Sequence, residues 1–268
     1  MESRSVPAIR GWRWILEGSR LFAAEPRGWF AIVATLFVAF KLSTLIPFIG
    51  PLLALVFFLL LPLFIAGLMQ ACRGMEHGQP LRVTYLLSGF QRNAGALITL
   101  GGVSLVGNLL TIVIINKLGG EAMLTIAKLA PQAATDKTVV DSLRQAVLAA
   151  TRATLTGLAI SLPLTMALWF SPMLVYFRGM RAPAALVASL VACWRNMLPM
   201  FVYGLAIFAA LIVVTPLALA TRVLDLGLWL LAPILAPSLY RSYLDIFPPG
   251  PEPEPETPVA TAPDGTVR

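Results

Sequence analysis

Residues 51–78 read PLLALVFFLLLPLFIAGLMQACRGMEHG, and this stretch decides the fold class. The part from 51 to 71 carries no charged side chain. As an α-helix it would rise about 30 Å, which is the thickness of the hydrocarbon core of a bilayer. Charge returns at Arg73, directly after the apolar run. The stretch therefore predicts a membrane-spanning helix that ends at an arginine.

The composition of the whole chain agrees with this prediction. Of its 268 residues, 58% are hydrophobic and 12% are charged, and the mean hydropathy is +0.81. Soluble domains carry about twice that share of charged residues. A soluble bundle with buried helices is the alternative, but the chain has too little polar surface to cover such a globule. We therefore predict an all-α polytopic membrane protein.

Six apolar runs are long enough to cross a bilayer as helices. The predicted spans are 29–48, 51–71, 94–115, 154–177, 198–220 and 224–244. The region before them, 1–28, holds five arginines and no uninterrupted apolar core, so we do not interpret it as a signal peptide. Three parts follow: an interfacial helix in 1–28, a six-span membrane domain over 29–246, and a tail over 247–268. The tail is rich in Pro and Glu, and we expect it to be disordered.

The positions of the basic residues predict the orientation of the spans. Arginines gather in 1–28 and in the connections after the second and fourth spans, whereas the turn at 46–51 has no charge. Both termini are therefore expected in the cytoplasm, with the protein in a bacterial inner membrane. The segment 116–152 is long and nearly balanced in charge. We place it in the periplasm, as a helical loop that extends the fourth span.

The tripeptide Arg-Gly-Met stands at 73–75 and again at 178–180, each time where an apolar run stops. Each copy leads through a proline and a helical stretch to an Arg-Asn pair, at 92–93 and at 195–196, just before a new span. A third copy occupies 10–28. Because internal repeats define an architecture, we predict three parallel hairpin repeats. Each would comprise an interfacial helix, an outward span, a turn and an inward span.

One arginine opens and another closes the interfacial segment of each repeat. These residues are Arg10, Arg27, Arg73, Arg92, Arg178 and Arg195. We expect them to fix the topology and to contact the phosphates of anionic lipids at the cytoplasmic face. A dedicated site for an anionic ligand is the alternative.

The first interfacial helix is amphipathic. Arg10, Arg13, Glu17 and Arg20 recur at helical spacing and form one polar stripe. The other side carries apolar residues, namely Ile9, Trp12, Ile15, Leu16 and Phe22. Such a helix is expected to lie flat in the membrane interface.

Few polar side chains fall inside the predicted spans. Lys41 could reach outward to the interface, form an ion pair with Asp225, or take part in transport. Gln70 and Asn108 could form hydrogen bonds between helices. These three residues are the candidates for an intramembrane polar site.

Motifs that carry chemistry are lacking. The chain has no nucleophile–base pair, no paired carboxylates and no phosphate-binding glycine loop, and Cys72, Cys193 and His77 make no metal motif. We therefore expect no enzyme activity, no catalytic residues, no cofactor, no metal and no nucleic-acid partner. Two function classes remain open. One is a scaffold, accessory or lipid-contacting component with an unidentified protein partner, and the other is a transporter or channel for a small or lipidic solute.

Several motifs carry a resemblance to a known group. They are VPAIRGWRWILEGSRLF at 6–22, Pro-x-x-Trp at 26–29, IPFIGP at 46–51 and AGLMQACRG at 66–74. In these motifs the chain resembles an uncharacterised group of six-span proteobacterial inner-membrane proteins, which implies an inner-membrane location and no defined activity. It is more weakly similar to the membrane domains that accompany some glycerophosphodiesterases, without any match to their hydrolase part.

Overall fold

The computed structural model describes residues 3–129, 137–221 and 226–248, and all regular elements in these ranges are helices. The tail that we predicted to be disordered lies outside the described residues from 249 onward. In chain order the elements are α1 (Arg10–Ala24), α2 (Pro26–Leu45), α3 (Gly50–Glu76), the short 3-10 helix η1 (Val83–Leu87), α4 (Ser88–Gln91), α5 (Ala94–Leu129), α6 (Lys137–Trp169), α7 (Ser171–Arg178), α8 (Ala182–Arg195), α9 (Met197–Thr221) and α10 (Leu226–Ile246).

Four described helices are long and apolar enough to cross a membrane. They are α3, α5, the nearly continuous stretch Val139–Arg178 of α6 and α7, and α9. A fifth span results if α1 and α2, which meet at an angle of 99°, form one broken span. The prediction of an all-helical protein with several long apolar helices is thus confirmed. The count of six spans and the three repeats remain predictions.

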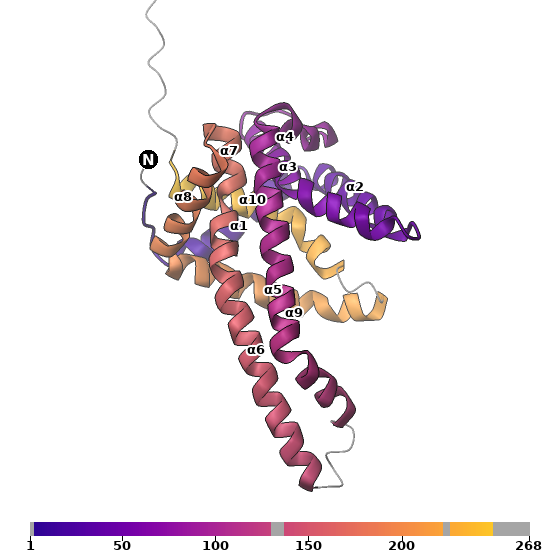
Figure 1. The fold of residues 1–268 in the computed structure, drawn as a ribbon. Coiled ribbons are helices and arrows are strands. Elements are labelled where there is room, and N and C mark those ends of the chain that lie inside the picture. Colours follow the sequence, from indigo (N-terminus) through magenta and orange to yellow (C-terminus); the bar gives the residue numbers. More distant parts are fainter. Residues whose placement is uncertain (1–2, 130–136, 222–225, 249–268) are drawn as a thin grey trace, which may run out of the picture.

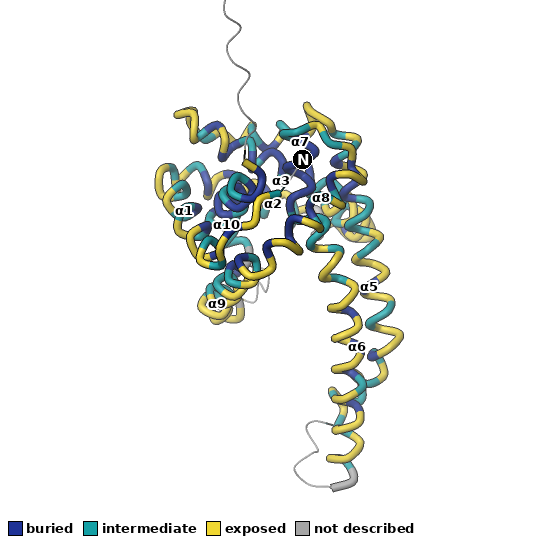
Figure 2. Tube along the Cα trace, turned by 90° about the vertical axis from the view of Figure 1, so that its left-hand side faces the viewer, coloured by how far each residue is buried: buried dark blue, intermediate teal, exposed yellow. Residues whose placement is uncertain are grey.

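Helices α5 and α6 form a long hairpin that extends away from the other helices (Figures 1 and 2). With 36 residues, α5 rises about 54 Å, well beyond the hydrocarbon core of a bilayer. Gly119 faces Ala153 and Gly157 faces Ile115 across the hairpin. Much of the segment 116–152 therefore continues the two spans as helix. In Figure 1, α2, α3 and α9 extend sideways from the hairpin axis.

The other helices and the adjoining part of α5 enclose the main apolar core, and a smaller buried cluster is formed by Ile32, Leu36 and Leu86. Buried residues are dark blue in Figure 2. The largest buried side chains of the main core come from helices that are far apart in the sequence, so the core joins the N-terminal and C-terminal helices. They include Trp14 of α1, Trp29 of α2, Leu63 and Met69 of α3, Leu97 and Leu100 of α5, Met173 of α7 and Tyr203 of α9.

Helix α1 packs into this core through a face that the sequence analysis did not assign. Gly11, Trp14 and Gly18 are buried, and a Cβ built on Gly11 would lie 2.1 Å from the backbone oxygen of Pro199 in α9. A Cβ on Gly18 would lie 2.6 Å from the backbone nitrogen of Ser238 in α10. The glycines therefore allow close backbone contact. The apolar stripe around Trp12 stays exposed, so α1 is both a core helix and a surface helix.

The two Arg-Gly-Met copies end their helices in different ways. Gly179 follows the last residue of α7 in the left-handed conformation, with φ of +65°, and its N–H donates to the Val175 carbonyl. Gly74 instead lies within α3, where a Cβ would come 2.6 Å from the Tyr85 hydroxyl. The left-handed glycine of the first copy is Gly78, with φ of +72°. The same tripeptide thus meets two needs, a helix cap and a close contact.

Candidate functional site: arginines at the helix ends

Three arginines lie near the ends of α3, α7 and α10, and we call them the arginine triad: Arg73, Arg178 and Arg241. The Arg73 guanidinium lies 5.6 Å from the centre of the Phe177 ring in α7. The Arg178 guanidinium lies 5.8 Å from the centre of the Tyr243 ring in α10. The triad therefore links α3 to α7 and α7 to α10 through contacts between a cation and an aromatic face.

An ion pair closes this set of links. Arg241 Nη1 lies 2.6 Å from Glu76 Oε1, and the Tyr240 hydroxyl donates to Glu76 Oε2 at 2.9 Å. Glu76 is the last residue of α3, so both bonds join α10 back to α3. The ends of the three helices are thus held together by one acidic side chain and three basic ones.

Arg178 also caps α10. Its Nε donates to the Tyr243 hydroxyl at 3.1 Å, and its Nη2 donates to the carbonyl oxygens of Phe247 at 2.7 Å and Pro248 at 2.9 Å. Carbonyl groups at the C-terminal end of a helix have no hydrogen-bond partner within the helix. A cation there also interacts favourably with the negative end of the helix dipole. Half-buried Arg178 therefore stabilises the C-terminal end of the described fold.

A second network surrounds Asp245 in α10. Arg10 donates from Nε and Nη2 to Asp245 Oδ2, both at 2.5 Å, and Trp14 Nε1 donates to the same oxygen at 2.6 Å. Arg10 Nη1 also lies 3.1 Å from Glu17 Oε1. The side chains of Arg10 and Asp245 are only 22% and 17% exposed. Arg10, which the sequence analysis assigned to lipid phosphate or topology, is therefore neutralised within the protein.

The other predicted arginines are exposed. Arg27, Arg73, Arg92 and Arg195 all have exposed side chains. Arg92 lies 6.0 Å from the centre of the Tyr176 ring, and Arg195 makes one long contact of 3.5 Å to the Ser3 carbonyl oxygen. The six predicted arginines thus divide into three sets. Arg10 and Arg178 form an inner pair, Arg73 is the exposed member of the triad, and Arg27, Arg92 and Arg195 are the outer arginines.

The asparagines next to two of these arginines fix the local backbone. Asn93 Nδ2 donates to the Val175 carbonyl at 2.9 Å, and Asn196 Oδ1 accepts from the backbone N–H of Val6 at 2.9 Å. Each asparagine also offers its own carbonyl oxygen to the first turn of the next long helix. In both Arg-Asn pairs the asparagine therefore forms hydrogen bonds that fix the backbone, whereas the arginine side chain is exposed at the surface.

The candidate intramembrane polar residues lie on three different helices. Lys41 Nζ of α2 lies 5.6 Å and 5.8 Å from the ring centres of Phe37 and Phe40. Asn108 of α5 donates to the Ser104 carbonyl of its own helix at 2.8 Å, and Gln70 of α3 is half-buried. Asp225, the suggested partner of Lys41, lies outside the described residues. These contacts give no support to a shared polar site.

Arg241 and two acidic residues, Glu76 and Asp245, belong to the networks but were not predicted from the sequence. The available signal was that acidic residues are few, 13 in the chain, and that these two stand at the ends of apolar runs. Within residues 3–129, 137–221 and 226–248, no three His, Cys, Asp or Glu side chains gather in a way that could hold a metal ion. The described networks consist of ion pairs, hydrogen bonds and cation–aromatic contacts that join α3, α7 and α10 and that join α1 to α10.

Replacing Glu76 with glutamine is expected to lower the thermal midpoint of the detergent-extracted protein. The half-buried Arg241 would lose its carboxylate partner, at a cost of about 2–3 kcal/mol. In a double-mutant cycle with Arg241→Gln the coupling should exceed 1 kcal/mol. Tyr240→Phe, which leaves the ion pair, should cost about 1 kcal/mol. Additive effects of the two substitutions would contradict the assigned pair.

The apolar helices and the charged helix ends together define a helical integral membrane protein. Over 214 residues the chain is 32% identical to a probable inner membrane protein of Burkholderia thailandensis, BTH_II0599, and the match covers 78% of this chain and 76% of that protein. The chain belongs to the family of that inner membrane protein. No family model and no solved structure matches it.

Proposed function

We propose that this chain is a non-enzymatic component of the bacterial inner membrane, a scaffold or accessory protein that contacts anionic lipid headgroups. In this proposal it spans the membrane six times in three hairpin repeats, with both termini in the cytoplasm and the distal end of the α5–α6 hairpin in the periplasm. The family relationship and the long apolar helices support the membrane location.

The division of the arginines carries the proposal. Arg10 is neutralised by carboxylates inside the fold, whereas Arg27, Arg92 and Arg195 have no acidic partner among the described residues. A guanidinium binds a phosphate through two parallel hydrogen bonds. Near an anionic leaflet each such cation adds about 1 kcal/mol of attraction. The outer arginines are therefore suited to lipid phosphates.

The apolar helices supply the matching hydrocarbon contact. Within the most apolar window of α9, 11% of the residues are buried inside the chain. Large exposed side chains such as Val213, Phe201 and Leu198 cover its outer surface. Beside the exposed Arg195, Trp194 is 68% exposed, as expected of an indole at a lipid interface. Lipid is the solvent that such a surface requires.

Transport of a small or lipidic solute is the competing function. It would be favoured by a polar cavity lined by Lys41, Gln70 or Asn108. Asn108 bonds within its own helix, and Lys41 lies over two phenylalanine rings. The proposal of a scaffold is supported instead by the exposed arginines and the exposed apolar surface of α9.

The triple variant Arg27→Gln, Arg92→Gln, Arg195→Gln tests the proposed lipid contact. Native mass spectrometry of the purified protein in mixed micelles would count bound phosphatidylglycerol and phosphatidylcholine. We expect the preference for phosphatidylglycerol to fall at least tenfold, because three contacts of about 1 kcal/mol each are lost.

The matched control removes the same charge elsewhere. Lys117→Gln, Arg144→Gln, Arg152→Gln takes three exposed cations from the α5–α6 hairpin. It should leave the lipid preference close to that of the wild type. If both triple variants lost the preference for phosphatidylglycerol equally, the preference would depend only on net charge. That result would contradict the proposed contact.

A further inference from the structure

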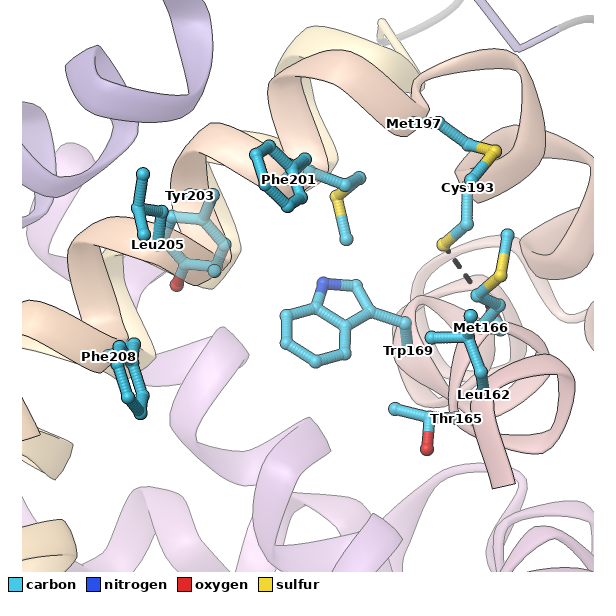
Figure 3. Close-up of a pocket in the computed structure, with 12 residues that line it drawn as sticks. Leu162, Thr165, Met166, Trp169, Cys193, Met197, Phe201, Tyr203, Leu205 and Phe208 are labelled. Carbon is cyan, nitrogen blue, oxygen red and sulfur yellow. Dashed lines mark hydrogen bonds between the residues drawn. The ribbon is translucent and has the colours of Figure 1, made fainter. Parts of the chain in front are cut away.

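An apolar cavity of about 500 Å³ lies between α6, α8 and α9, within the range of ligand sites in proteins. Figure 3 shows the Trp169 indole in its middle, with Met166, Met197 and Phe201 around it. The twelve lining residues include no charged side chain. Phe201 and Phe208, on the outer side of α9, are 68% and 60% exposed. The cavity therefore lies beside the surface that faces hydrocarbon.

One hydrogen-bond donor in this cavity has no acceptor. Trp169 Nε1 is buried and lacks a partner in the part of the chain that the structure describes. Two other polar groups of the lining already have partners: the Tyr203 hydroxyl bonds the Ser238 hydroxyl at 2.6 Å, and Cys193 Sγ contacts the Met166 carbonyl at 3.5 Å. A buried donor without an acceptor costs about 1–3 kcal/mol. The Trp169 indole N–H is thus left without an acceptor from the described part of the chain.

Gly204 borders open space in the cavity. A Cβ built on this residue would meet no atom within 4 Å, although Gly204 lines the cavity in the middle of α9. Glycine within a helix costs about 1 kcal/mol relative to alanine. The methionines around the indole are unbranched and adapt to the shape of an apolar guest. The space and the flexible walls together suit an extended hydrocarbon chain.

From these observations we infer that the cavity binds one acyl chain of a membrane glycerophospholipid, and that the flexible methionines of the lining move aside so that its ester carbonyl accepts a hydrogen bond from Trp169 Nε1. An ester fits better than a free fatty acid, because a carboxylate would need a cation and the lining residues offer none. The inference deepens the proposed lipid contact by adding a site for the chain. It does not depend on the outer arginines.

The test uses phosphatidylcholine with a diazirine on one acyl chain, added to the full-length protein in nanodiscs and activated by light. Peptide mapping is expected to place the crosslinks in 162–169 and 197–208. Trp169→Phe retains the ring and removes the donor, so labelling there should fall about threefold to tenfold at limiting probe. A diazirine fatty acid should label these segments weakly.

The second variant fills the space. Gly204→Leu should abolish labelling of the two segments, whereas Gly95→Leu, at another glycine with nothing within 4 Å of its Cβ, should leave it intact. The triple arginine variant should also label normally, which separates this site from the headgroup contact. Labelling unchanged by Trp169→Phe or by Gly204→Leu, equal labelling by the fatty acid, or crosslinks between two copies of the chain would overturn the inference.

Discussion

Alanine at Gly101 should destabilise the protein more than any other single methyl group added to a helix. A Cβ at this position would lie 1.9 Å from the backbone oxygen of Leu59 and 2.8 Å from its carbonyl carbon. Because both atoms belong to the backbone of α3, no side-chain rotation relieves the clash. Helices α3 and α5 must separate, at a cost of about 3 kcal/mol. We expect the thermal midpoint to fall by roughly 6–12 °C.

The adjacent glycine provides a matched control. A Cβ on Gly102 would lie 4.0 Å from Leu59 Cδ1, an ordinary contact. Gly102→Ala should therefore raise the midpoint slightly, because alanine favours the helix by up to about 1 kcal/mol. Fluorescence-detected size-exclusion chromatography after heating would measure both variants. Equal midpoints would contradict the packing of α3 against α5.

Alanine at Asp245 should have the second-largest effect. Asp245 Oδ2 accepts from Arg10 at 2.5 Å and from Trp14 Nε1 at 2.6 Å. Removing the carboxylate leaves the mostly buried Arg10 guanidinium with Glu17 as its remaining acidic partner, and it leaves the Trp14 indole N–H without its acceptor. Breaking such a pair on one side costs about 3 kcal/mol. We expect the midpoint to fall by several degrees and protease to cleave near α1, which is held to α10 by this contact.

Two further variants identify the cause. Asp245→Asn keeps an acceptor oxygen but loses the charge, so its midpoint should lie between those of the wild type and Asp245→Ala. Asp141→Ala removes an exposed aspartate from α6 and should change the free energy of unfolding by less than about 0.5 kcal/mol. If Asp245→Ala proved as mild as Asp141→Ala, the network around Arg10 would not stabilise the fold.

Hydrophobic runs predicted the apolar helices well. The predicted spans at 51–71 and 94–115 fall within α3 and α5, and 198–220 falls within α9. Such runs can be recognised in a sequence because a membrane-spanning helix needs apolar side chains over about 30 Å. Hydropathy does not report the angle between neighbouring helices. It therefore gave no sign of the 99° bend between α1 and α2 or of the sideways direction of α9 (Figure 1).

The candidate site was predictable only in part. Arg73 and Arg178 stood out because their tripeptide recurs at the ends of apolar runs. Their different environments, one exposed and one bonded to the carbonyls beyond α10, arise from contacts between distant segments. Gly11 is a similar case, since only the position of α9 explains why no side chain is tolerated there. Spacing along one helix carries no information about such partners.

The lipid shell of the wild-type protein tests the central claim most directly. Extraction with an amphipathic polymer would remove the protein from its own membrane with its neighbouring lipids, and mass spectrometry would quantify the headgroups. The account predicts that anionic headgroups are enriched around the protein relative to the whole membrane, and that the enrichment disappears in the Arg27→Gln, Arg92→Gln, Arg195→Gln variant. A shell with the composition of the bulk membrane would contradict the claim that this protein contacts anionic lipids through its outer arginines.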